Sequence, residues 1–161
     1  MKLIILILMA ITSPAGKPLI VKSPAFANNE RIPAKYTCKG DNVNPSLTID
    51  DIPANTQSLA LIMDDPDAPS GTYVHWVMWN IPVSTPIGEN SAPGTQGRNS
   101  RDESKYTGPC PPSGTHRYFF KVYALDTRLN NLGTNSGKQD LLNAMQGHVL
   151  ASGELVGLYG K

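Results

Sequence analysis

The sequence predicts a single, mainly β domain, and its composition and its apolar runs support that prediction. Glycine and proline each occur 14 times in 161 residues, which favours many turns and short strands over long helices. Three runs have the apolar or alternating pattern of strands, at residues 58–63, 73–80 and 116–125. The 14 basic and 13 acidic residues are scattered, so no nucleic-acid partner is expected.

The N-terminal segment has the features of a secretory signal. Lys2 precedes the apolar run 3–11, and small residues follow as far as Ala15. The run is too short to cross a bilayer, and no other segment is predicted to be transmembrane. We expect residues 1–15 to be a signal peptide, residues 16–161 to form the domain, and the protein to be periplasmic or secreted. The alternative is a buried N-terminal strand in a cytoplasmic protein.

The two cysteines, Cys38 and Cys110, predict one disulfide if the protein is exported. In the chain-entropy model, closing so long a loop stabilises the fold by roughly 4 kcal/mol. Sequence separation gives no distance between the sulfur atoms. The alternative is therefore a pair of free thiols, one of them buried.

The first part of the domain predicts short β elements. Residues 19–21 fit a first strand. Residues 32–36 fit an edge strand or an irregular extended segment, because Pro33 cannot donate a hydrogen bond to a neighbouring strand. Residues 45–49 alternate enough to form another strand before the next turn.

Two strands are expected at the centre of the sheet. Residues 58–63 are apolar on both faces and run directly into two aspartates, which is typical of a strand that is covered on both sides. Residues 73–80 form the second strand. Alternation with period two places its side chains on two faces: Tyr73, His75, Val77 and Trp79 on one, and Val74, Trp76 and Met78 on the other.

The segment 82–115 has no sustained period and is rich in proline and glycine, so we interpret it as a functional loop that contains at most a short strand or turn. Residues 116–125 then form the third clear strand. Alternation predicts that its side chains also divide between two faces: His116, Tyr118, Phe120 and Val122 on one, and Arg117, Phe119, Lys121 and Tyr123 on the other.

One short helix is predicted near the C-terminus. Ser136 and Gln139 have the spacing of a capping box, and Gly147 is expected to end the helix. Its apolar stripe consists of Leu141, Leu142 and Met145. Residues 148–158 follow as the last strand.

His75 lies within an apolar strand and therefore needs a polar partner, because an unpaired buried imidazole is unfavourable by a few kcal/mol. The nearest candidates in the sequence are Asp65 and Asp67. Two alternatives stay open: His75 is a structural residue tied to one carboxylate, and the aspartates merely begin a turn.

A second group of polar residues favours a site over these structural alternatives. The stiff segment 108–112 (Gly-Pro-Cys-Pro-Pro) leads to His116 and Tyr118, which share one face at a strand end. Two acids, two histidines and a tyrosine at strand ends are more polar groups than a fold needs there, and the two groups together form a more specific pattern than either group alone.

At these residues the sequence resembles the phosphatidylethanolamine-binding protein family, in particular its bacterial branch similar to Raf kinase inhibitor protein. The resemblance covers residues 26–161. Its strongest motifs are residues 65–69 (Asp-Pro-Asp-Ala-Pro), His75 and Trp76 with Asn80, and residues 114–120. The bacterial branch is matched by residues 36–38, 108–112 and 147–151.

The resemblance implies a β-sandwich-like fold around a central antiparallel sheet, with one or two short helices and a small anion pocket. Asp65, His75, His116 and Tyr118 would bind the ligand. The expected ligand is a phosphate-like group or a phospholipid head group such as phosphoethanolamine. Tyrosine and imidazole can donate to anionic oxygens. An ionised Asp65 would repel a phosphate, so we expect it to be protonated on binding or screened by a histidinium, and binding to depend on pH.

Other residues of the motifs are assigned supporting roles. Asp67 would orient the site rather than touch the ligand, and Arg117, on the opposite strand face, would be its structural ion-pair partner. The remaining supporting or rim residues are Pro69, Trp76, Gly108, Pro111 and Pro112. Animal relatives carry a C-terminal helix over the pocket that this sequence lacks, which predicts a more open site.

The resemblance favours a non-enzymatic binding protein that needs no cofactor and that modulates a kinase-class or protease-class partner, as relatives do. An acid/base hydrolase using the same side chains is the alternative, although no Ser or Cys lies in a recognisable nucleophile motif. A metal site of two histidines and a carboxylate ranks lower, because no compact ligand motif is present. A protease inhibitor is also considered, without an identifiable inhibitory segment.

Overall fold

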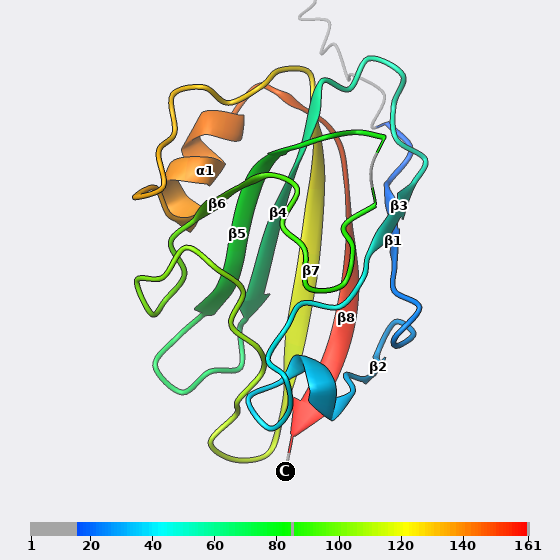
Figure 1. Cartoon of the computed structure of the whole chain (residues 1–161). Coiled ribbons are helices and arrows are strands. Elements are labelled where there is room, and N and C mark those ends of the chain that lie inside the picture. Colours follow the sequence, from blue (N-terminus) through cyan, green and yellow to red (C-terminus); the bar gives the residue numbers. More distant parts are fainter. Residues whose placement is uncertain (1–15, 85, 161) are drawn as a thin grey trace, which may run out of the picture.

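The computed structural model describes residues 16–84 and 86–160; the signal-like segment 1–15 lies outside them. A six-stranded sheet dominates the fold, with strand order β2-β8-β7-β4-β5-β6, and a two-stranded sheet of β1 and β3 lies beside it (Figure 1). The strands are β1 Ile20–Lys22, β2 Glu30–Arg31, β3 Thr48–Asp50, β4 Ser58–Asp65, β5 Tyr73–Ile81, β6 Thr95–Gly97, β7 Thr115–Leu125 and β8 Val149–Gly160. The helices are the 3₁₀ turn η1, Ala34–Tyr36, and α1, Lys138–Met145.

The predicted mainly β class is confirmed, but the main sheet is mixed rather than purely antiparallel. The short edge strand β2 runs parallel to β8, and all the other pairs in this sheet are antiparallel. The chain then leaves the edge at Pro33, which has no N–H to continue the pairing. Pro33 is the N-cap of the next element, and its carbonyl accepts the Tyr36 N–H at 3.1 Å, so residues 34–36 form a 3₁₀ turn instead of an extended segment.

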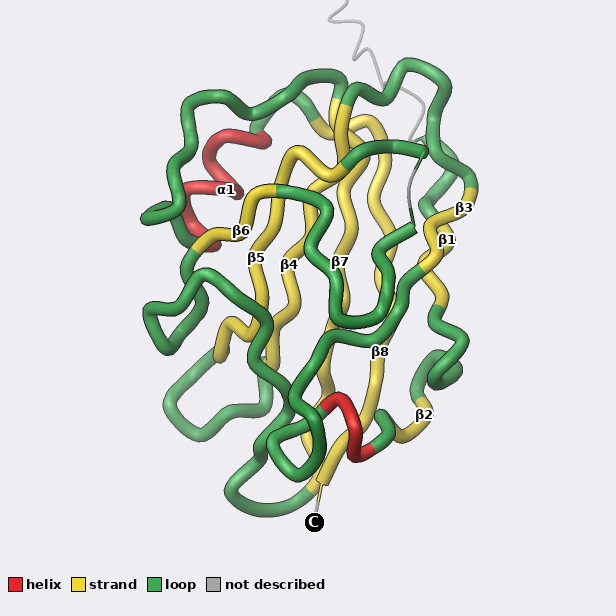
Figure 2. Tube along the Cα trace, viewed as in Figure 1, coloured by secondary structure: helices red, strands yellow, loops and turns green. Residues whose placement is uncertain are grey.

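The sheet buries apolar side chains on both faces, as its central sequences predict. All eight residues of β4 are buried. On one face, Phe120 and Trp76 belong to a large cluster that continues toward the small sheet. On the other face, Ile62 and Trp79 pack with Leu141 from α1, and Figure 2 shows this helix lying against the β5 side of the sheet. No helix within the described ranges is long and apolar enough to cross a membrane.

The faces predicted for β5 are wrong at His75, because a β-bulge interrupts the alternation. Met63 pairs with Trp76, but its neighbour Asp64 pairs with Val74, which leaves His75 as the extra residue. His75 and Trp76 therefore both lie on the face of β5 that carries Tyr118 on β7, where His75 contacts the Tyr118 ring. The predicted grouping of His75 with Val77 and Trp79 does not hold, because those two side chains lie on the α1 face.

The helix forms where it was predicted, but its cap lies one residue later than expected. Gly137 is the N-cap, and its N–H donates to the Asp140 carboxylate at 2.9 Å, so the predicted Ser136 and Gln139 box is not used. Asp140 is a better partner at this position because a carboxylate also favours the positive end of the helix dipole. The helix ends before Gly147, whose φ of 77° is the left-handed conformation expected after a helix.

The segment 82–115 is ordered by pairing and by a disulfide. It contributes β6, and it returns toward η1, where Cys110 is bonded to Cys38, as predicted. The Cys38 N–H donates to the Pro109 carbonyl at 3.1 Å. Gly108 lies so close to this turn that a Cβ would be 2.4 Å from the Tyr36 carbonyl oxygen, which excludes a larger residue without a backbone shift.

Candidate functional site

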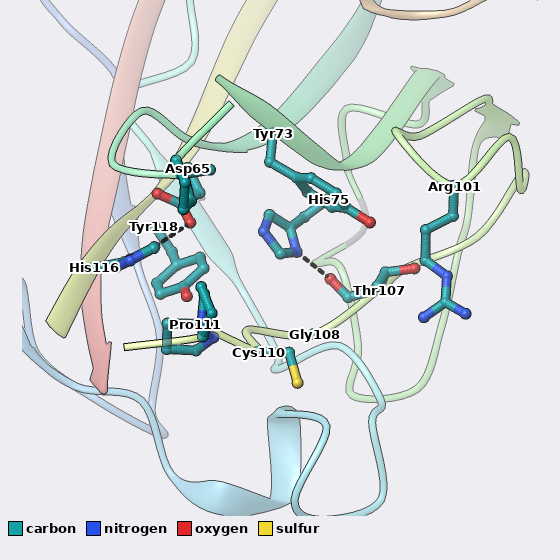
Figure 3. A pocket seen from close by; sticks show the side chains of 13 residues that line it. Asp65, Tyr73, His75, Arg101, Thr107, Gly108, Cys110, Pro111, His116 and Tyr118 are labelled. Atoms are coloured by element: carbon teal, nitrogen blue, oxygen red, sulfur yellow. Dashed lines mark hydrogen bonds and ion pairs between the residues drawn. The ribbon is translucent and has the colours of Figure 1, made fainter. Parts of the chain in front are cut away.

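The candidate site is a pocket of about 220 Å³ at the end of the sheet where β4 finishes and β5 and β7 begin (Figure 3). Antiparallel pairing puts these three strand ends at one edge. The loop that precedes β7 covers the side opposite the strands. The lining residues are Asp65, Ala68, Pro69, Tyr73, His75, Arg101, Thr107, Gly108, Cys110, Pro111, Pro112, His116 and Tyr118.

An ordered chain of hydrogen bonds fixes the acidic side of the pocket. The His116 imidazole donates from Nδ1 to Asp65 Oδ2 at 2.7 Å, and Asp65 Oδ1 accepts the Asp67 backbone N–H at 2.8 Å. Asp67 accepts three hydrogen bonds from Arg117, two of them from the guanidinium. The expected Asp67 and Arg117 ion pair is therefore present, and it holds the turn that positions Asp65.

The hydrogen bonds from Arg117 hold the pKa of Asp67 at about 2, below its ordinary value. The resulting stabilisation is complete above the ordinary aspartate pKa, near 4, and is lost only as the pH falls toward 2. The pair is therefore intact at any pH near neutrality.

His75 forms the opposite side of the pocket and has a defined tautomer. Its Nδ1 lies 2.7 Å from the Thr107 carbonyl oxygen, and a carbonyl can only accept, so Nδ1 carries the hydrogen. Burial lowers the pKa of His75 below its ordinary value. In its neutral form the ring therefore presents Nε2 as an acceptor, whereas the sequence-based expectation was an imidazole that donates to the anion.

Three aromatic rings form a continuous wall. The His75 ring centroid lies 4.8 Å from that of Tyr73 and 5.2 Å from that of Tyr118. The Tyr118 side chain is fully buried, and its hydroxyl has no hydrogen-bond partner among the described residues. Burial also raises the pKa of Tyr118 well above its ordinary value, so the group is a neutral phenol. Tyr118 is also one of the residues that line the pocket, so its unpaired hydroxyl is a candidate donor to a ligand.

Replacing Tyr118 by Phe is expected to leave the free protein as stable as before or more stable by about 1 kcal/mol. The substitution removes a buried hydroxyl that has no partner while keeping the ring in place. Chemical denaturation of both proteins without ligand tests this expectation. A loss of more than about 1 kcal/mol would show that the hydroxyl has a structural role in the free protein.

Sequence reasoning located part of the pocket wall. The four predicted ligand residues line one cavity, together with Pro69, Gly108, Pro111 and Pro112. Two supporting candidates do not reach the cavity. Asp67 acts through its hydrogen bonds, and Trp76 is buried in the core, where its Nε1 donates to Gln96 Oε1 at 2.7 Å.

Three polar lining residues were missed: Tyr73, Arg101 and Thr107. Alternation predicted that Tyr73 lies on the same strand face as His75, and this could have identified it as a pocket residue. Arg101 and Thr107 lie in the aperiodic segment, where no pattern predicts the direction of a side chain. Arg101 supplies a positive charge at the pocket, which the sequence-based site lacked. No group of three or more metal-binding side chains exists among the described residues.

Comparisons with known proteins give one consistent result. The sequence pattern of the family described as "Phosphatidylethanolamine-binding protein" matches residues 22–160. A UPF0098 protein of Methanothermobacter thermautotrophicus is 48% identical over 147 residues, which are 86% of this chain and 97% of that protein. One from Pyrococcus horikoshii is 52% identical over 148 residues, 85% of this chain and 74% of its own length.

Solved structures agree with the sequence comparison. A crystal structure of a phosphatidylethanolamine-binding protein homolog from Chlamydia trachomatis superposes with a TM-score of 0.85 at 39% identity, covering 89% of this chain and 98% of that one. Escherichia coli YbcL superposes with a TM-score of 0.82 at 28% identity, covering 90% and 99% respectively.

Proposed function

Because this chain belongs to the phosphatidylethanolamine-binding protein family, we propose that its pocket binds a small oxyanion, as free phosphate or as a phosphoethanolamine head group, without catalysing a reaction. The unpartnered Tyr118 hydroxyl carries the proposal. A donor buried in a wall of a preformed cavity is unfavourable until a ligand accepts from it.

The charges around the pocket support an anionic ligand. The Asp65 carboxylate is turned to His116, which donates to it, so part of its negative charge is compensated inside the protein. Arg101 lines the other side, and its Nε lies 3.7 Å from Glu103. That exposed, loose pair leaves the guanidinium able to turn toward an anion.

A binding role fits the wall better than hydrolysis. Both cysteines are joined in a disulfide, so Cys110 is no nucleophile, and no serine is among the lining residues. The Thr107 hydroxyl oxygen accepts a hydrogen bond from Asn99 Nδ2 at 3.0 Å, which occupies one of its lone pairs. Neutral His75 presents no N–H to the cavity. The Tyr118 hydroxyl is then the hydrogen-bond donor beside His75 in the aromatic wall. We also predict a protein partner of the kinase or protease class, which would bind at the rim of the pocket.

We further propose that the protein acts outside the cytoplasm. The disulfide supports this proposal, since such bonds are typical of oxidising compartments. The segment 1–15, which carries the predicted signal, lies outside the described residues. Fractionation of the source cells, followed by N-terminal sequencing of the recovered protein, checks both the location and the expected cleavage after Ala15.

Titration calorimetry with inorganic phosphate and with O-phosphoethanolamine tests the binding role. We expect saturable binding with one site, weakened about tenfold or more by Tyr118→Phe because the ligand loses its buried donor. Absence of heat with either compound, confirmed by unchanged NMR signals of the pocket residues, would reject the proposal.

Arg101→Gln is expected to weaken phosphate binding several-fold at low salt and less at high salt, because an exposed charge acts through a screened field. Arg98→Gln is the matched control. Arg98 lies three residues earlier, bonds to Asp102 and Asn135, and does not line the pocket. Equal effects of the two substitutions would show that Arg101 acts only through net charge.

A further inference from the structure

The fixed tautomer of His75 defines what its second nitrogen can bind. The Thr107 carbonyl holds the hydrogen on Nδ1, and the Thr107 N–H in turn donates to the His75 carbonyl at 3.0 Å. The two residues are therefore tied to each other from both sides. Figure 3 shows the free ring nitrogen of His75 on the side of the ring that faces Asp65 and Tyr118.

Several titratable or charged groups surround this ring. Asp65 approaches from β4, Tyr73 from β5, His116 and Tyr118 from β7, and Arg101 from the loop. Asp65 is paired with His116, and the Tyr118 hydroxyl has no hydrogen-bond partner within residues 16–84 and 86–160. His75 and Tyr118 line the same cavity, so a ligand there has one acceptor, Nε2, and one donor, the Tyr118 hydroxyl, in the wall beside it.

We propose, on the basis of the oxyanion-binding role above, that the pocket selects an oxyanion which itself carries a hydrogen, namely a phosphate monoester or free phosphate in its singly charged form. The P–OH group donates to His75 Nε2, while a second oxygen accepts from the Tyr118 hydroxyl. The ligand needs both an acceptor and a donor, and the singly protonated phosphoryl group supplies both.

The same geometry disfavours anions that have no hydrogen. A sulfate ester, or the phosphodiester group of a membrane phospholipid, would place an oxygen lone pair against the lone pair of Nε2. A site built to pair a donor rejects an analogue that lacks it far more strongly than an apolar pocket rejects a small change in size. The inferred ligand is therefore a soluble monoester or phosphate, and the phosphodiester of an intact lipid is excluded.

A charged His75 would give the opposite selectivity. An imidazolium would donate from both nitrogens and would accept a hydrogen-free anion readily. Burial among the Tyr73 and Tyr118 rings opposes that charged form. The choice between the two states can be measured, because they predict different affinities for a hydrogen-free anion of equal size and charge.

Methyl phosphate and methyl sulfate form the test pair, because near pH 5.5 both are tetrahedral monoanions of similar size and only methyl phosphate carries an O–H. We expect methyl phosphate to bind at least about tenfold more tightly. Its affinity should fall by about tenfold per pH unit above its pKa, near 6, as the hydrogen is lost. Methyl sulfate should show no such decline.

Equal affinities for the two methyl esters, or methyl sulfate binding that strengthens as the pH falls, would overturn this inference and leave oxyanion binding intact. Failure of both esters and of phosphate to bind would instead reject the oxyanion role itself.

A second comparison distinguishes a soluble phosphate monoester from the phosphodiester of a lipid head group. It uses O-phosphoethanolamine as the monoester and glycerophosphoethanolamine as the diester. We expect the diester to bind at least about tenfold more weakly, and equal binding would overturn the inference.

His75→Asn assigns the selectivity to this residue. The shorter amide can still donate to the Thr107 carbonyl but has no group at the position of Nε2. The preference for methyl phosphate over methyl sulfate should therefore disappear. His148→Asn is the control, since His148 bonds to Asp126 at the surface. Retention of the preference in a folded His75→Asn protein would contradict the assignment, and the comparison on the unaltered protein stands if that variant does not fold.

Discussion

Replacing Cys38 and Cys110 together by serine is expected to lower the free energy of unfolding by roughly 4 kcal/mol. The disulfide joins residues separated by 72 positions, and in the chain-entropy model a loop of this size gives a stabilisation of that order. For a domain of this length the change corresponds to a melting temperature lower by roughly 8 to 16 °C. Differential scanning calorimetry without reductant measures both quantities.

Reductant provides the control for the disulfide. It should lower the melting temperature of the unaltered protein by a similar amount and leave the serine variant unchanged. A variant that melts within about 2 °C of the unaltered protein would show that the unfolded chain gains little freedom when the bond is absent. Phosphate affinity should also fall, because the bond fixes the loop that carries Gly108, Pro111 and Pro112 against the pocket.

The second large effect is expected on the opposite face of the sheet, at Asp64. Its side chain is only 1% exposed and lies between two lysines: Lys121 Nζ is 3.0 Å from Oδ1, and Lys138 Nζ is 2.6 Å from Oδ2. Lys121 comes from β7 and Lys138 from α1, so the cluster ties the helix to the sheet. Replacing both lysines by methionine should destabilise the fold by about 3 to 5 kcal/mol, because a buried carboxylate is left without compensation.

Each single lysine variant should have a much smaller effect, about 1 kcal/mol or less, because the other lysine still compensates Asp64. The cycle of two single variants and the double variant is therefore expected to be strongly non-additive. Urea denaturation measures all four proteins, with Lys22→Met as the control for an exposed pair with Asp50. Additive losses would show that the two lysines act independently of the carboxylate.

The sequence predicted those parts of the site that regular strands determine. His116 and Tyr118 lie on one face because β7 pairs with β8 without a register shift from Thr115 to Ala124, so period-two alternation holds there. Asp65 was located because an apolar run leads directly into it. The apolar composition of β4 likewise predicted that both of its faces are buried, and the strand is buried along its whole length.

The remaining parts of the fold and of the site depend on particular contacts between residues, which the periodicity of the sequence does not predict. The bulge in β5 arises from pairing with β4, and it changed the face on which His75 lies. Arg101 and Thr107 are positioned by loop contacts such as the hydrogen bond from the Thr107 N–H to the His75 carbonyl. The helix start was misplaced by one residue because Ser136 and Gly137 are both acceptable N-caps, and only the Asp140 contact distinguishes them.

Because of the bulge, the pocket wall can be lost in evolution while the fold is kept. With one residue fewer in this part of β5, simple alternation would resume, and the imidazole would leave the wall that it shares with Tyr118. The neighbouring strands would keep their ladder hydrogen bonds, so the six-stranded sheet and its packed side chains would persist without the pocket wall. The loss of a single codon here would thus remove the proposed binding wall while leaving the fold in place.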